Sequence, residues 1–304
     1  MLSASMYDYI KTIIPGERIL FHEPMSKYTT FRVGGEAECL LVVQTEEELA
    51  KLIPYLNQID QEYFILGNGS NLLVGDKGYR GMIVKFGEEM SQIRIEGTRM
   101  TVKAGALMSK AAVTAKQNGL TGLEFAAGIP GSVGGGIVMN AGAYEGEMKQ
   151  IVESVRVMDR DGQILILDND TMEFGYRTSI IRNRPFIVVE AVLQLAEGRQ
   201  EEIEARMEEL AMLRKSKQPL EYASAGSTFK RPEGYYAGKL IMDAGMRGYR
   251  IGGAQVSDKH CGFIVNTGKA TAADIKEVIE EVQERVKERF HVALEPEIVF
   301  LGDF

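Results

Sequence analysis

The first part of the chain places one polar, periodic segment between two short apolar runs. The runs Cys39–Val43 and Tyr63–Leu66 have the length and composition of buried strands. Between them, Thr45 and Glu48 have the spacing of a capping box, which marks the start of a helix. We therefore expect a strand, a helix and a strand, followed directly by the polar loop Gly67–Asn71.

The middle of the chain predicts mainly β-structure. From Gly81 onward, short alternating runs (GMIVKF, QIRIEG and RMTVKAG) indicate strands, and the stretch ALMSKAAVTAKQNG indicates a helix that closes on Gly119. After the glycine-rich stretch Gly128–Glu147, the runs IVESVRVMD and QILILD meet at RDG as a hairpin, and RPFIVVEAVLQL adds a strand.

The last third of the chain predicts a small α/β domain. A charged amphipathic helix over Gln200–Lys217 connects it to the middle region. The run GFIVN is then followed by a long helix with Thr271 as its N-cap, and by PEIVFLG as a last strand. Strand, helix and strand together are the pattern of a small layered domain.

Composition places the chain among ordinary globular proteins of two or three domains. It has 304 residues, of which 45% are hydrophobic and 26% are charged. The net charge of −8 disfavours a general nucleic-acid binder, which needs a basic face for phosphates. Cys39 and Cys261 match no metal or disulfide spacing, so we expect no metal site and a reducing compartment. The longest apolar stretch is short and is broken by Glu190, and no secretion signal is visible, so we expect a cytoplasmic protein without membrane insertion.

Two glycine-rich segments are the clearest candidates for ligand binding. The loop GNGSN follows a strand, and its successive backbone N–H groups could hold an anion. It is not a dinucleotide fingerprint, because Leu72 occupies the sixth position, and no G-K-[ST] follows for a P-loop. The alternative for this loop is a plain turn, and for Gly128–Glu147 it is close packing of the backbone at a sheet corner. Together, however, the two segments could clasp a long ligand such as a dinucleotide.

Several motifs together resemble the UDP-N-acetylenolpyruvoylglucosamine reductase family. They are YTTFRVGG, GNGSNLLV, GLEFAAGIPGSVGGGIVMNAGAYEGE, FGYRTS, AGSTFKRP and EPEIVFLG, in the family's order and approximate spacing over nearly the whole chain. The resemblance implies an α+β protein: a two-domain FAD-binding fold of the vanillyl-alcohol-oxidase-like (PCMH) type, with a small α/β substrate-binding domain.

The resemblance also implies domain borders. We expect a first FAD-binding subdomain over residues 1–82, to which the C-terminal strand 297–304 returns, a second over 83–204, and a substrate-binding domain over 205–304. The short spacing between Arg177 and Ser227 indicates the shorter subclass of the family. We expect a monomer. FAD should be bound non-covalently, because no histidine or cysteine lies between Cys39 and His260.

In this family NADPH reduces FAD, and the reduced flavin delivers hydride to C3 of an enolpyruvyl UDP-sugar before C2 is protonated. By resemblance, three groups of residues contact FAD in this chain. They are Tyr28, Thr29 and Arg32 near the flavin; Gly67, Asn68, Gly69, Ser70 and Asn71; and Gly128, Pro130, Gly131, Ser132, Gly134, Gly135, Asn140, Ala141 and Gly142.

Three residues match the catalytic residues of the family. Arg177 would bind the substrate carboxylate in a fork and offset the charge that develops when hydride arrives. Ser227 would donate the proton to C2, and Glu297 would act protonated or through a further donor. Each has an ordinary alternative: a solvated basic patch for Arg177, a small-residue turn for Ser227, and an exposed strand start for Glu297.

The last third also offers groups that suit a uridine diphosphate. Cations can balance its two phosphates, and amphipathic tyrosine rings lie nearby in the sequence, although ordinary surface cations and core-facing tyrosines remain the alternative. The candidates are Lys239, Arg247, Lys259, Tyr236 and Tyr249, with Gln255 and Asn266 as weaker ones. Two other functions stay open from the residues alone: a flavin-binding electron-transfer subunit, and an oxidoreductase of the same fold with another acceptor.

Overall fold

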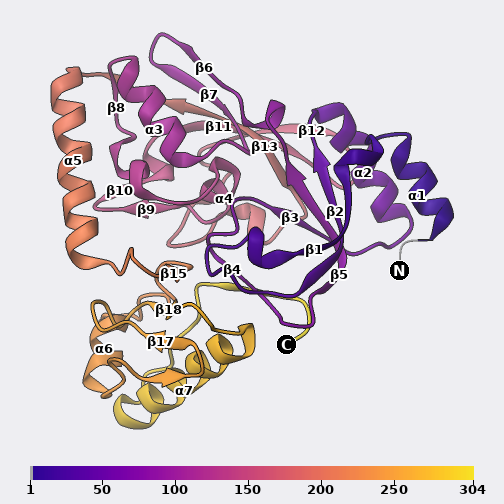
Figure 1. Cartoon of the computed structure of the whole chain (residues 1–304). Helices are drawn as coiled ribbons and strands as arrows, with labels where there is room; N and C mark the ends of the chain where they lie inside the picture. The colour runs from indigo at the N-terminus through magenta and orange to yellow at the C-terminus, as the bar shows by residue number, and fades with distance from the viewer. Residues whose placement is uncertain (1–2) are drawn as a thin grey trace. The chain divides into compact units, whose positions relative to one another are not determined.

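The computed structural model describes residues 3–304, which form two compact units (Figure 1). The first unit comprises the chain up to Phe21, Cys39–Asn68 and Gly81–Leu213. The second comprises His22–Glu38, Gly69–Arg80 and Arg214–Phe304. The predicted division into three domains stays a prediction.

The α-helices are α1 (Ala4–Lys11), α2 (Glu46–Gln58), α3 (Met108–Gln117), α4 (Val133–Val138), α5 (Gln200–Lys217), α6 (Ala237–Asp243) and α7 (Ala272–Phe290). The short 3₁₀ helices are η1 (Gly16–Arg18), η2 (Met25–Lys27), η3 (Glu89–Ser91), η4 (Glu124–Gly128), η5 (Met148–Gln150) and η6 (Ile180–Arg182).

The strands form several small sheets. One has the order β1 (Ile19–Pro24), β2 (Glu36–Val43), β5 (Tyr79–Phe86), β3 (Tyr63–Leu66), and another the order β12 (Ile164–Asp168), β11 (Val152–Met158), β13 (Ile187–Gln194), β7 (Arg99–Lys103), β6 (Ile93–Glu96). A third has the order β15 (Ala223–Ser224), β18 (Ile264–Asn266), β17 (Ala254–Val256), β16 (Arg250–Ile251). The pairs are β4 (Leu72–Val74) with β19 (Val299–Leu301), β8 (Leu120–Thr121) with β14 (Ala196–Glu197), and β9 (Gly142–Ala143) with β10 (Gly146–Glu147).

The predicted strand, helix and strand at the start of the chain are confirmed as β2, α2 and β3. Thr45 caps α2, since its side chain accepts a hydrogen bond from the N–H of Glu48. The Glu48 carboxylate also accepts hydrogen bonds from Arg18 and from the N–H of Gln44. Strand β3 pairs in parallel with β5, with Leu66 opposite Lys85, and it ends directly before Gly67.

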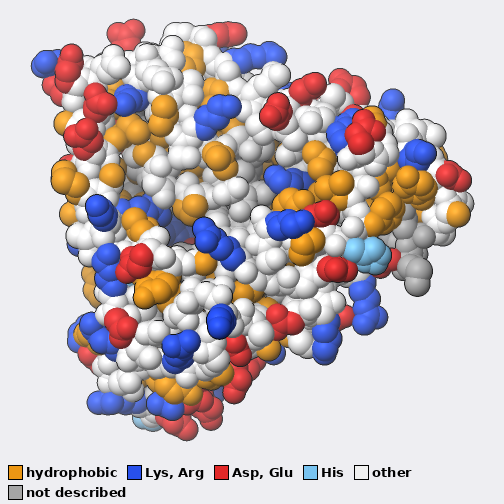
Figure 2. All heavy atoms as spheres, in the orientation of Figure 1, with side chains coloured by type: hydrophobic (Ala, Val, Ile, Leu, Met, Phe, Trp, Pro, Cys, Tyr) orange, Lys and Arg blue, Asp and Glu red, His pale blue; other side chains and the backbone are white. Residues whose placement is uncertain are grey.

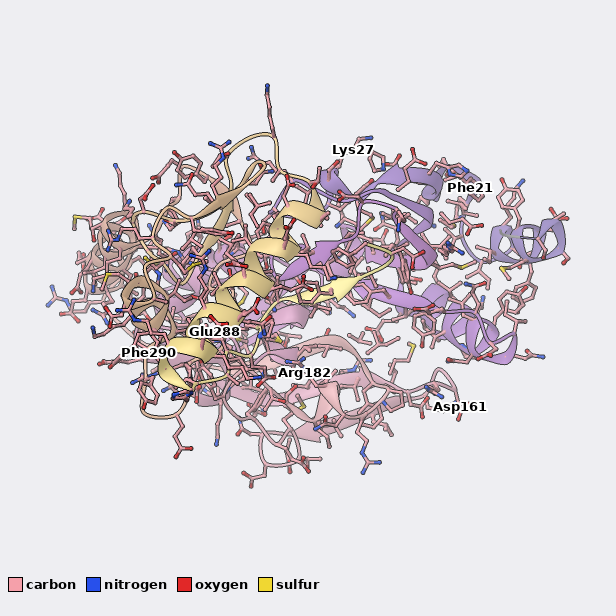
Figure 3. The ribbon with its side chains drawn as sticks, turned by 90° about the horizontal axis from the view of Figure 1, so that it is seen from below. Phe21, Lys27, Asp161, Arg182, Glu288 and Phe290 are labelled. Carbon is pink, nitrogen blue, oxygen red and sulfur yellow. The ribbon has the colours of Figure 1, made fainter. Side chains whose placement is uncertain are left out.

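The predicted hairpin at RDG is confirmed in the five-stranded antiparallel sheet. Strands β11 and β12 pair from Ser154 with Asp168 to Met158 with Ile164, and Asp161 lies at the turn between them (Figure 3). Strand β11 also pairs with β13, which continues to β7. The apolar core of this unit runs from α1 and α2 to this sheet. Hydrophobic side chains also gather on the surface over α1 and α2, where Tyr9 and Ile59 are exposed (Figure 2).

Two expectations for helices need correction. The glycine-rich stretch contains the short helix α4, which the sequence analysis did not predict because glycine is a poor helix former. Ser132 caps it by accepting from the N–H of Gly135. The helix α5 has the predicted bounds but not the expected amphipathic face, because only Ile203 and Leu210 in it are buried.

The second unit has its own core between α6, α7 and the sheet of β15 to β18. The predicted N-cap of α7 is confirmed: Thr271 and Asp274 form a capping box. Glu288 and Phe290 lie near the C-terminal end of this helix (Figure 3). Strand β19 pairs in parallel with β4, with Val299 opposite Leu72, so the end of the chain runs beside a strand from its first 82 residues.

A cluster of four charged side chains joins α2 to the five-stranded sheet. Glu46, in the first turn of α2, binds Lys103 of β7 and Arg156 of β11, with 2.8 Å between its Oε2 and Nη2 of Arg156. Glu190 of β13 binds the same two cations from the other side. Burial opposes ionisation of Glu46, but hydrogen bonds from Lys103 and Arg156 outweigh it and lower the pKa of this carboxyl.

We expect Glu46→Gln to reduce the free energy of unfolding by about 1–3 kcal/mol near pH 7, between the values for exposed and buried ion pairs. Because the pKa of Glu46 is lower in the folded state, its contribution is complete above the unfolded-state pKa and is lost as the pH falls through the folded-state pKa. The difference from the parent protein should therefore be full at neutral pH and shrink as the pH falls below the ordinary pKa of a glutamate carboxyl. Denaturant titrations at several pH values measure it.

The control is Glu208→Gln on α5, where the side chain is exposed and stability should stay unchanged at every pH. A loss for Glu46→Gln that is the same at neutral and acid pH would contradict the assigned role of its charge.

Candidate functional site

The two glycine-rich segments meet within the first unit. The Nδ2 group of Asn68 donates a hydrogen bond to the carbonyl oxygen of Pro130 at 2.6 Å. Beside it, a Cβ atom on Gly67 would lie 2.5 Å from Oγ of Ser132, closer than real Cβ contacts come. Glycine at position 67 therefore leaves room for the Ser132 side chain, which lies close to its backbone.

The loop Gly67–Asn71 presents a row of unused donors. Across the described part of the chain, none of its five backbone N–H groups donates to another residue. Its glycine at position 69 has a φ of +60°, which turns the backbone so that successive N–H groups can point to one side. Such an arrangement is suited to the oxygens of a phosphate or pyrophosphate.

The second segment uses most of its N–H groups inside the protein. Those of Val133 and Gly134 donate to the carbonyl oxygens of Ala106 and Ala104, and that of Gly135 donates to Ser132. A Cβ on Gly134 would lie 2.9 Å from that of Ala104. The idea that both segments hold a ligand through main-chain amides therefore fits the first segment. In the second, packing accounts for the glycines at the start of α4.

The segment Tyr28–Arg32 lies against the loop in the second unit. The N–H of Thr30 donates to the carbonyl oxygen of Gly69 at 3.1 Å, and a Cβ on Gly69 would overlap the carbonyl oxygen of Tyr28. Oγ1 of Thr30 is buried and has no hydrogen-bond partner in residues 3–304, which is a cost unless a bound group supplies one.

The other residues of this segment have different surroundings. Thr29 donates through Oγ1 to the carbonyl oxygen of Val33 and is buried, whereas Arg32 is exposed with a φ of +57°. Burial raises the pKa of Tyr28, and so does the neighbouring Glu23 carboxylate, which accepts a hydrogen bond from the Tyr28 hydroxyl. Thr29 therefore fixes the local backbone, and the side chain of Arg32 is accessible to a ligand.

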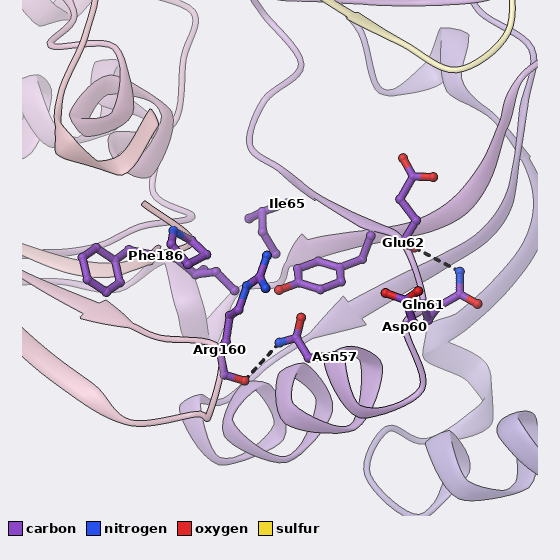
Figure 4. Close-up of a pocket in the computed structure, with 10 residues that line it drawn as sticks. Asn57, Asp60, Gln61, Glu62, Ile65, Arg160 and Phe186 are labelled. Carbon is purple, nitrogen blue, oxygen red and sulfur yellow. Dashed lines mark hydrogen bonds between the residues drawn. The ribbon is translucent and has the colours of Figure 1, made fainter. Parts of the chain in front are cut away.

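A pocket of about 640 Å³ opens in the first unit at the other end of β3. Tyr63 and Ile65 of β3 line it, together with Arg160 of the hairpin turn and Phe186 before β13. Arg160 is held by its carbonyl oxygen, which accepts from Nδ2 of Asn57, and its side chain extends toward Ile65 (Figure 4). The sequence analysis did not find this pocket, because three segments remote in the chain build it and none of them carries a motif.

Arg177 is held against the second glycine-rich segment. It is half-buried, and its Nη2 group donates to the carbonyl oxygen of Gly142 at 3.2 Å. Asn140, predicted to contact the cofactor, is buried and donates to the carbonyl oxygen of Gly175 in the same turn as Arg177. Ala141 accepts at its carbonyl oxygen from the N–H of Met148. The structure thus brings Arg177 together with the Asn140–Gly142 part of the segment.

Ser227 and Glu297 belong to neighbouring segments of the second unit. Ser227 is exposed and follows Gly226, whose φ is +76°. The next residue, Thr228, is buried and accepts at its carbonyl oxygen from the N–H of Glu297 at 2.8 Å. The carbonyl oxygen of Glu297 in turn accepts from Nδ2 of Asn71 at 3.0 Å. A chain of hydrogen bonds therefore links the serine turn, Glu297 and the first glycine loop.

The residues predicted to bind the uridine diphosphate make several internal contacts. Lys239 is exposed and pairs with Asp243, and Arg247 donates to the carbonyl oxygen of Asp258, whose carboxylate accepts from Gln255. Tyr249 lies under Arg285, with 4.7 Å from the guanidinium carbon to the ring centre.

The predicted residue Asn266 is buried and acts on the main chain around it. Its Nδ2 group donates to the carbonyl oxygen of Phe31, and its Oδ1 atom accepts from Gly268 and Ala270. The structure therefore gives Asn266 a role in the fold of the second unit. Lys259 donates to the carbonyl oxygen of Lys215, and Tyr236 stacks on Arg231.

The residues around the first loop fit a bound dinucleotide. Within residues 3–304, the backbone N–H groups of Gly67–Asn71 donate to no other residue and suit its pyrophosphate, and the buried Oγ1 of Thr30 has no partner. The pocket of the first unit has a volume of about 640 Å³. Within residues 3–304, no three His, Cys, Asp or Glu side chains gather to hold a metal ion. No helix in this part of the chain is long and apolar enough to span a membrane.

Comparison with protein-family models gives two matches. Residues 37–168 match an FAD binding domain, and residues 218–301 match the C-terminal domain of UDP-N-acetylenolpyruvoylglucosamine reductase. The first match contains both glycine-rich segments, and the second contains Ser227 and Glu297. The predicted FAD cofactor is confirmed by these matches together with the relatives described next.

Curated relatives match over the full chain. UDP-N-acetylenolpyruvoylglucosamine reductase of Caldanaerobacter subterraneus is 52% identical over 298 residues, which cover 98% of each chain. The protein of the same name from Clostridioides difficile is 48% identical over 303 residues, which cover 100% of each chain.

Solved structures give the same result for the fold. The crystal structure of UDP-N-acetylenolpyruvylglucosamine reductase from Thermus caldophilus is 38% identical, has a TM-score of 0.82, and covers 94% of this chain and 99% of its own. The glucose dehydrogenase Phl p 4.0202 is 13% identical, with a TM-score of 0.50 over 64% of this chain and 44% of its own, and shares the fold alone. The predicted α+β fold with an FAD-binding part of the PCMH type is confirmed.

We expect Gly67→Ala to weaken FAD binding. The added methyl group would meet Oγ of Ser132, and overpacking of this kind costs about 1–3 kcal/mol. If that cost falls on the bound state, the Kd for FAD rises roughly 5- to 150-fold. Titration of the apoprotein with FAD, followed by flavin fluorescence, measures the change.

The matched control is Gly16→Ala, because a Cβ at Gly16 has its nearest neighbour at 3.7 Å. Equal affinities for FAD in both variants and the parent protein would show that the contact between the two segments does not support the cofactor site.

Proposed function

Since this chain belongs to the UDP-N-acetylenolpyruvoylglucosamine reductase family and is an FAD-dependent oxidoreductase, we propose that NADPH is its reductant and that it works in two half-reactions. In the first, NADPH would supply a hydride that bound FAD accepts. In the second, hydride reaches C3 of the enolpyruvyl group of the UDP-sugar and a proton reaches C2, which gives UDP-N-acetylmuramate. Bound FAD supplies the hydride carrier between the two substrates.

The observation that carries this proposal is the hydrogen-bonded chain through Glu297. Its N–H binds the carbonyl oxygen of Thr228, next to Ser227, and its carbonyl oxygen binds Asn71 in the glycine loop. The segments that carry the candidate proton donor, the carboxyl group and the glycine loop are thereby joined by hydrogen bonds. Their proximity supports a role for Ser227 and Glu297 in protonating a carbon beside the bound cofactor.

We propose separate tasks for the three catalytic candidates. Arg177 binds the carboxylate of the enolpyruvyl group and stabilises the negative charge that develops there. Ser227 donates the proton to C2; its hydroxyl is exposed on a turn that the buried Thr228 anchors through its N–H to Gly262 and its Oγ1 to Ile264. Glu297, half-buried, orients the reacting groups from the neighbouring segment.

The dinucleotide is proposed to lie along β3. The N–H groups of Gly67–Asn71 would hold its pyrophosphate, and residues lining the pocket of about 640 Å³ would hold its adenosine end. Ile65, which lines that pocket, lies two residues before Gly67, a separation of roughly 7 Å along a strand. Apolar side chains such as Phe186 cover a ring, and Arg160 and Asn57 offer polar contacts to it. Exposed cations of the second unit, such as Lys239, balance the phosphates of the UDP-sugar.

An anaerobic assay tests the function. The yellow holoprotein is mixed with NADPH, the loss of flavin absorbance is followed, and UDP-N-acetylglucosamine enolpyruvate is then added. We expect rapid bleaching and rapid return of colour. Absence of bleaching rules out NADPH as the reductant, and bleached protein that is indifferent to the UDP-sugar rules out the proposed second half-reaction.

Replacement of Ser227 should separate the two half-reactions. In Ser227→Ala, bleaching by NADPH should keep its rate, whereas reoxidation by the UDP-sugar should slow by about 10²- to 10⁴-fold, the usual contribution of a positioned acid. Stopped-flow absorbance of the flavin measures both rates. Ser224→Ala, in β15 of the same unit, is the matched control and should retain both. Equal slowing of both half-reactions in Ser227→Ala would argue against a proton-donor role.

The flavin should leave the protein without breaking a covalent bond, because residues 40–259 contain no histidine or cysteine to link it. Acid precipitation should give a colourless pellet and a yellow supernatant containing intact FAD. Flavin that stays with the denatured protein, detected by its fluorescence on a denaturing gel, would contradict non-covalent binding.

A further inference from the structure

Arg177 has a backbone conformation that its own residue type does not favour. Its φ is +54°, in the left-handed region, where residues other than glycine, asparagine and aspartate are rare. It lies in a tight turn in which Gly175 and Thr178 exchange backbone hydrogen bonds of 3.1 and 3.3 Å. Such a conformation persists only when the surrounding structure fixes it.

Asn140 supplies one of the contacts that fix this turn. Its side chain is 1% exposed, and its Nδ2 group donates to the carbonyl oxygen of Gly175 at 3.0 Å and to Oε2 of Glu147 at 3.1 Å. Its Oδ1 atom accepts from the N–H of Lys149 at 2.9 Å. Both amide protons are thus used inside the protein, and one of them holds the turn two residues before Arg177.

Other hydrogen bonds also hold the turn around Arg177. Oγ of Ser179, which is buried, donates to the carbonyl oxygen of Val138 at 2.9 Å. The guanidinium of Arg177 itself donates to Gly142, and Arg182 donates to the carbonyl oxygen of Arg177 at 3.3 Å. The segment Val138–Gly142 therefore contacts the turn before, at and after Arg177.

We propose that Asn140 is a positioning residue for Arg177, and not a cofactor contact as its place in the glycine-rich motif suggested. Through Gly175 it fixes the direction in which the guanidinium leaves the turn. This inference rests on the proposed role of Arg177 in binding the substrate carboxylate. It predicts that loss of the Asn140 amide affects the half-reaction that uses Arg177 and leaves reduction of the flavin unchanged.

Two replacements of Asn140 test the inference in the holoenzyme. Asn140→Asp keeps the side-chain size, the tolerance for positive φ and the acceptor for Lys149, but loses both donated hydrogen bonds. Asn140→Gly also tolerates the positive φ, and it adds no charge beside Glu147. In both variants we expect NADPH to bleach the flavin at the parent rate. Reoxidation by the UDP-sugar should slow by about 10- to 100-fold, with a raised KM for it.

A double-mutant cycle separates positioning from a general structural role. If Asn140 acts through Arg177, then Asn140→Gly should slow reoxidation less than about twofold when Arg177 is already replaced by lysine. Ser179→Ala removes a second contact of the turn and should give the same selective loss if the Asn140 variants fail to fold. Asn169→Asp is the matched control, because Asn169 also donates to main-chain carbonyls but not to this turn.

Equal slowing of both half-reactions in the Asn140 variants would overturn the inference. It would also be overturned if Asn140→Gly slowed reoxidation as much with lysine at position 177 as with arginine. Parent protein that bleaches with NADPH but ignores the UDP-sugar would instead overturn the proposed function. The two failures are therefore distinguishable in one set of stopped-flow traces.

Discussion

The close contact of Gly67 and Asn68 with Pro130 and Ser132 is the constraint on which the candidate cofactor site depends. At Gly67 there is no room for a Cβ atom beside Ser132, and Asn68 closes the contact through Pro130. Within residues 3–304, none of the five backbone N–H groups from Gly67 to Asn71 donates to another residue, so other contacts hold the loop. The energy that orders the loop thus comes from side-chain and packing contacts, and the main chain is left for a ligand.

The glycine-rich stretch after Ile129 meets a different demand. Its helix α4 packs so tightly that Cβ atoms on Gly134 and Gly136 would meet Ala104 and Met108 at 2.9 and 2.8 Å. Its first N–H groups are already bound to carbonyl oxygens of the neighbouring chain. Two segments of similar composition therefore have different roles. The first presents backbone N–H groups to a ligand, and the second packs a helix and a turn against the first.

The sequence predicted best where a repeating pattern and a terminal signal agreed. Thr45 before α2, Thr271 before α7 and the RDG turn between β11 and β12 each combine periodicity with a local hydrogen bond or turn, and the structure has all of these elements. Helix α4 was missed because packing, which propensity does not include, overrides the cost of its three glycines. The pocket at the start of β3 and the contact of Asn140 with Gly175 depend on which remote segments meet, and no local pattern encodes that.

The position of an amide side chain in a motif also does not show whether it faces a ligand or the protein. Asn140 and Asn68 both lie in glycine-rich segments, yet the first is 1% exposed with both amide protons used, and the second is exposed and closes a contact between loops. Burial decides between the two cases, because a buried amide must find partners within the fold and is then committed to them. For Asn140 the partner is the turn that carries Arg177 in a left-handed conformation, a state that costs about 1–2 kcal/mol for a side chain of this kind. The hydrogen bonds to that turn are of the size needed to offset this cost, so the segment Val138–Gly142 stabilises the turn that carries the guanidinium.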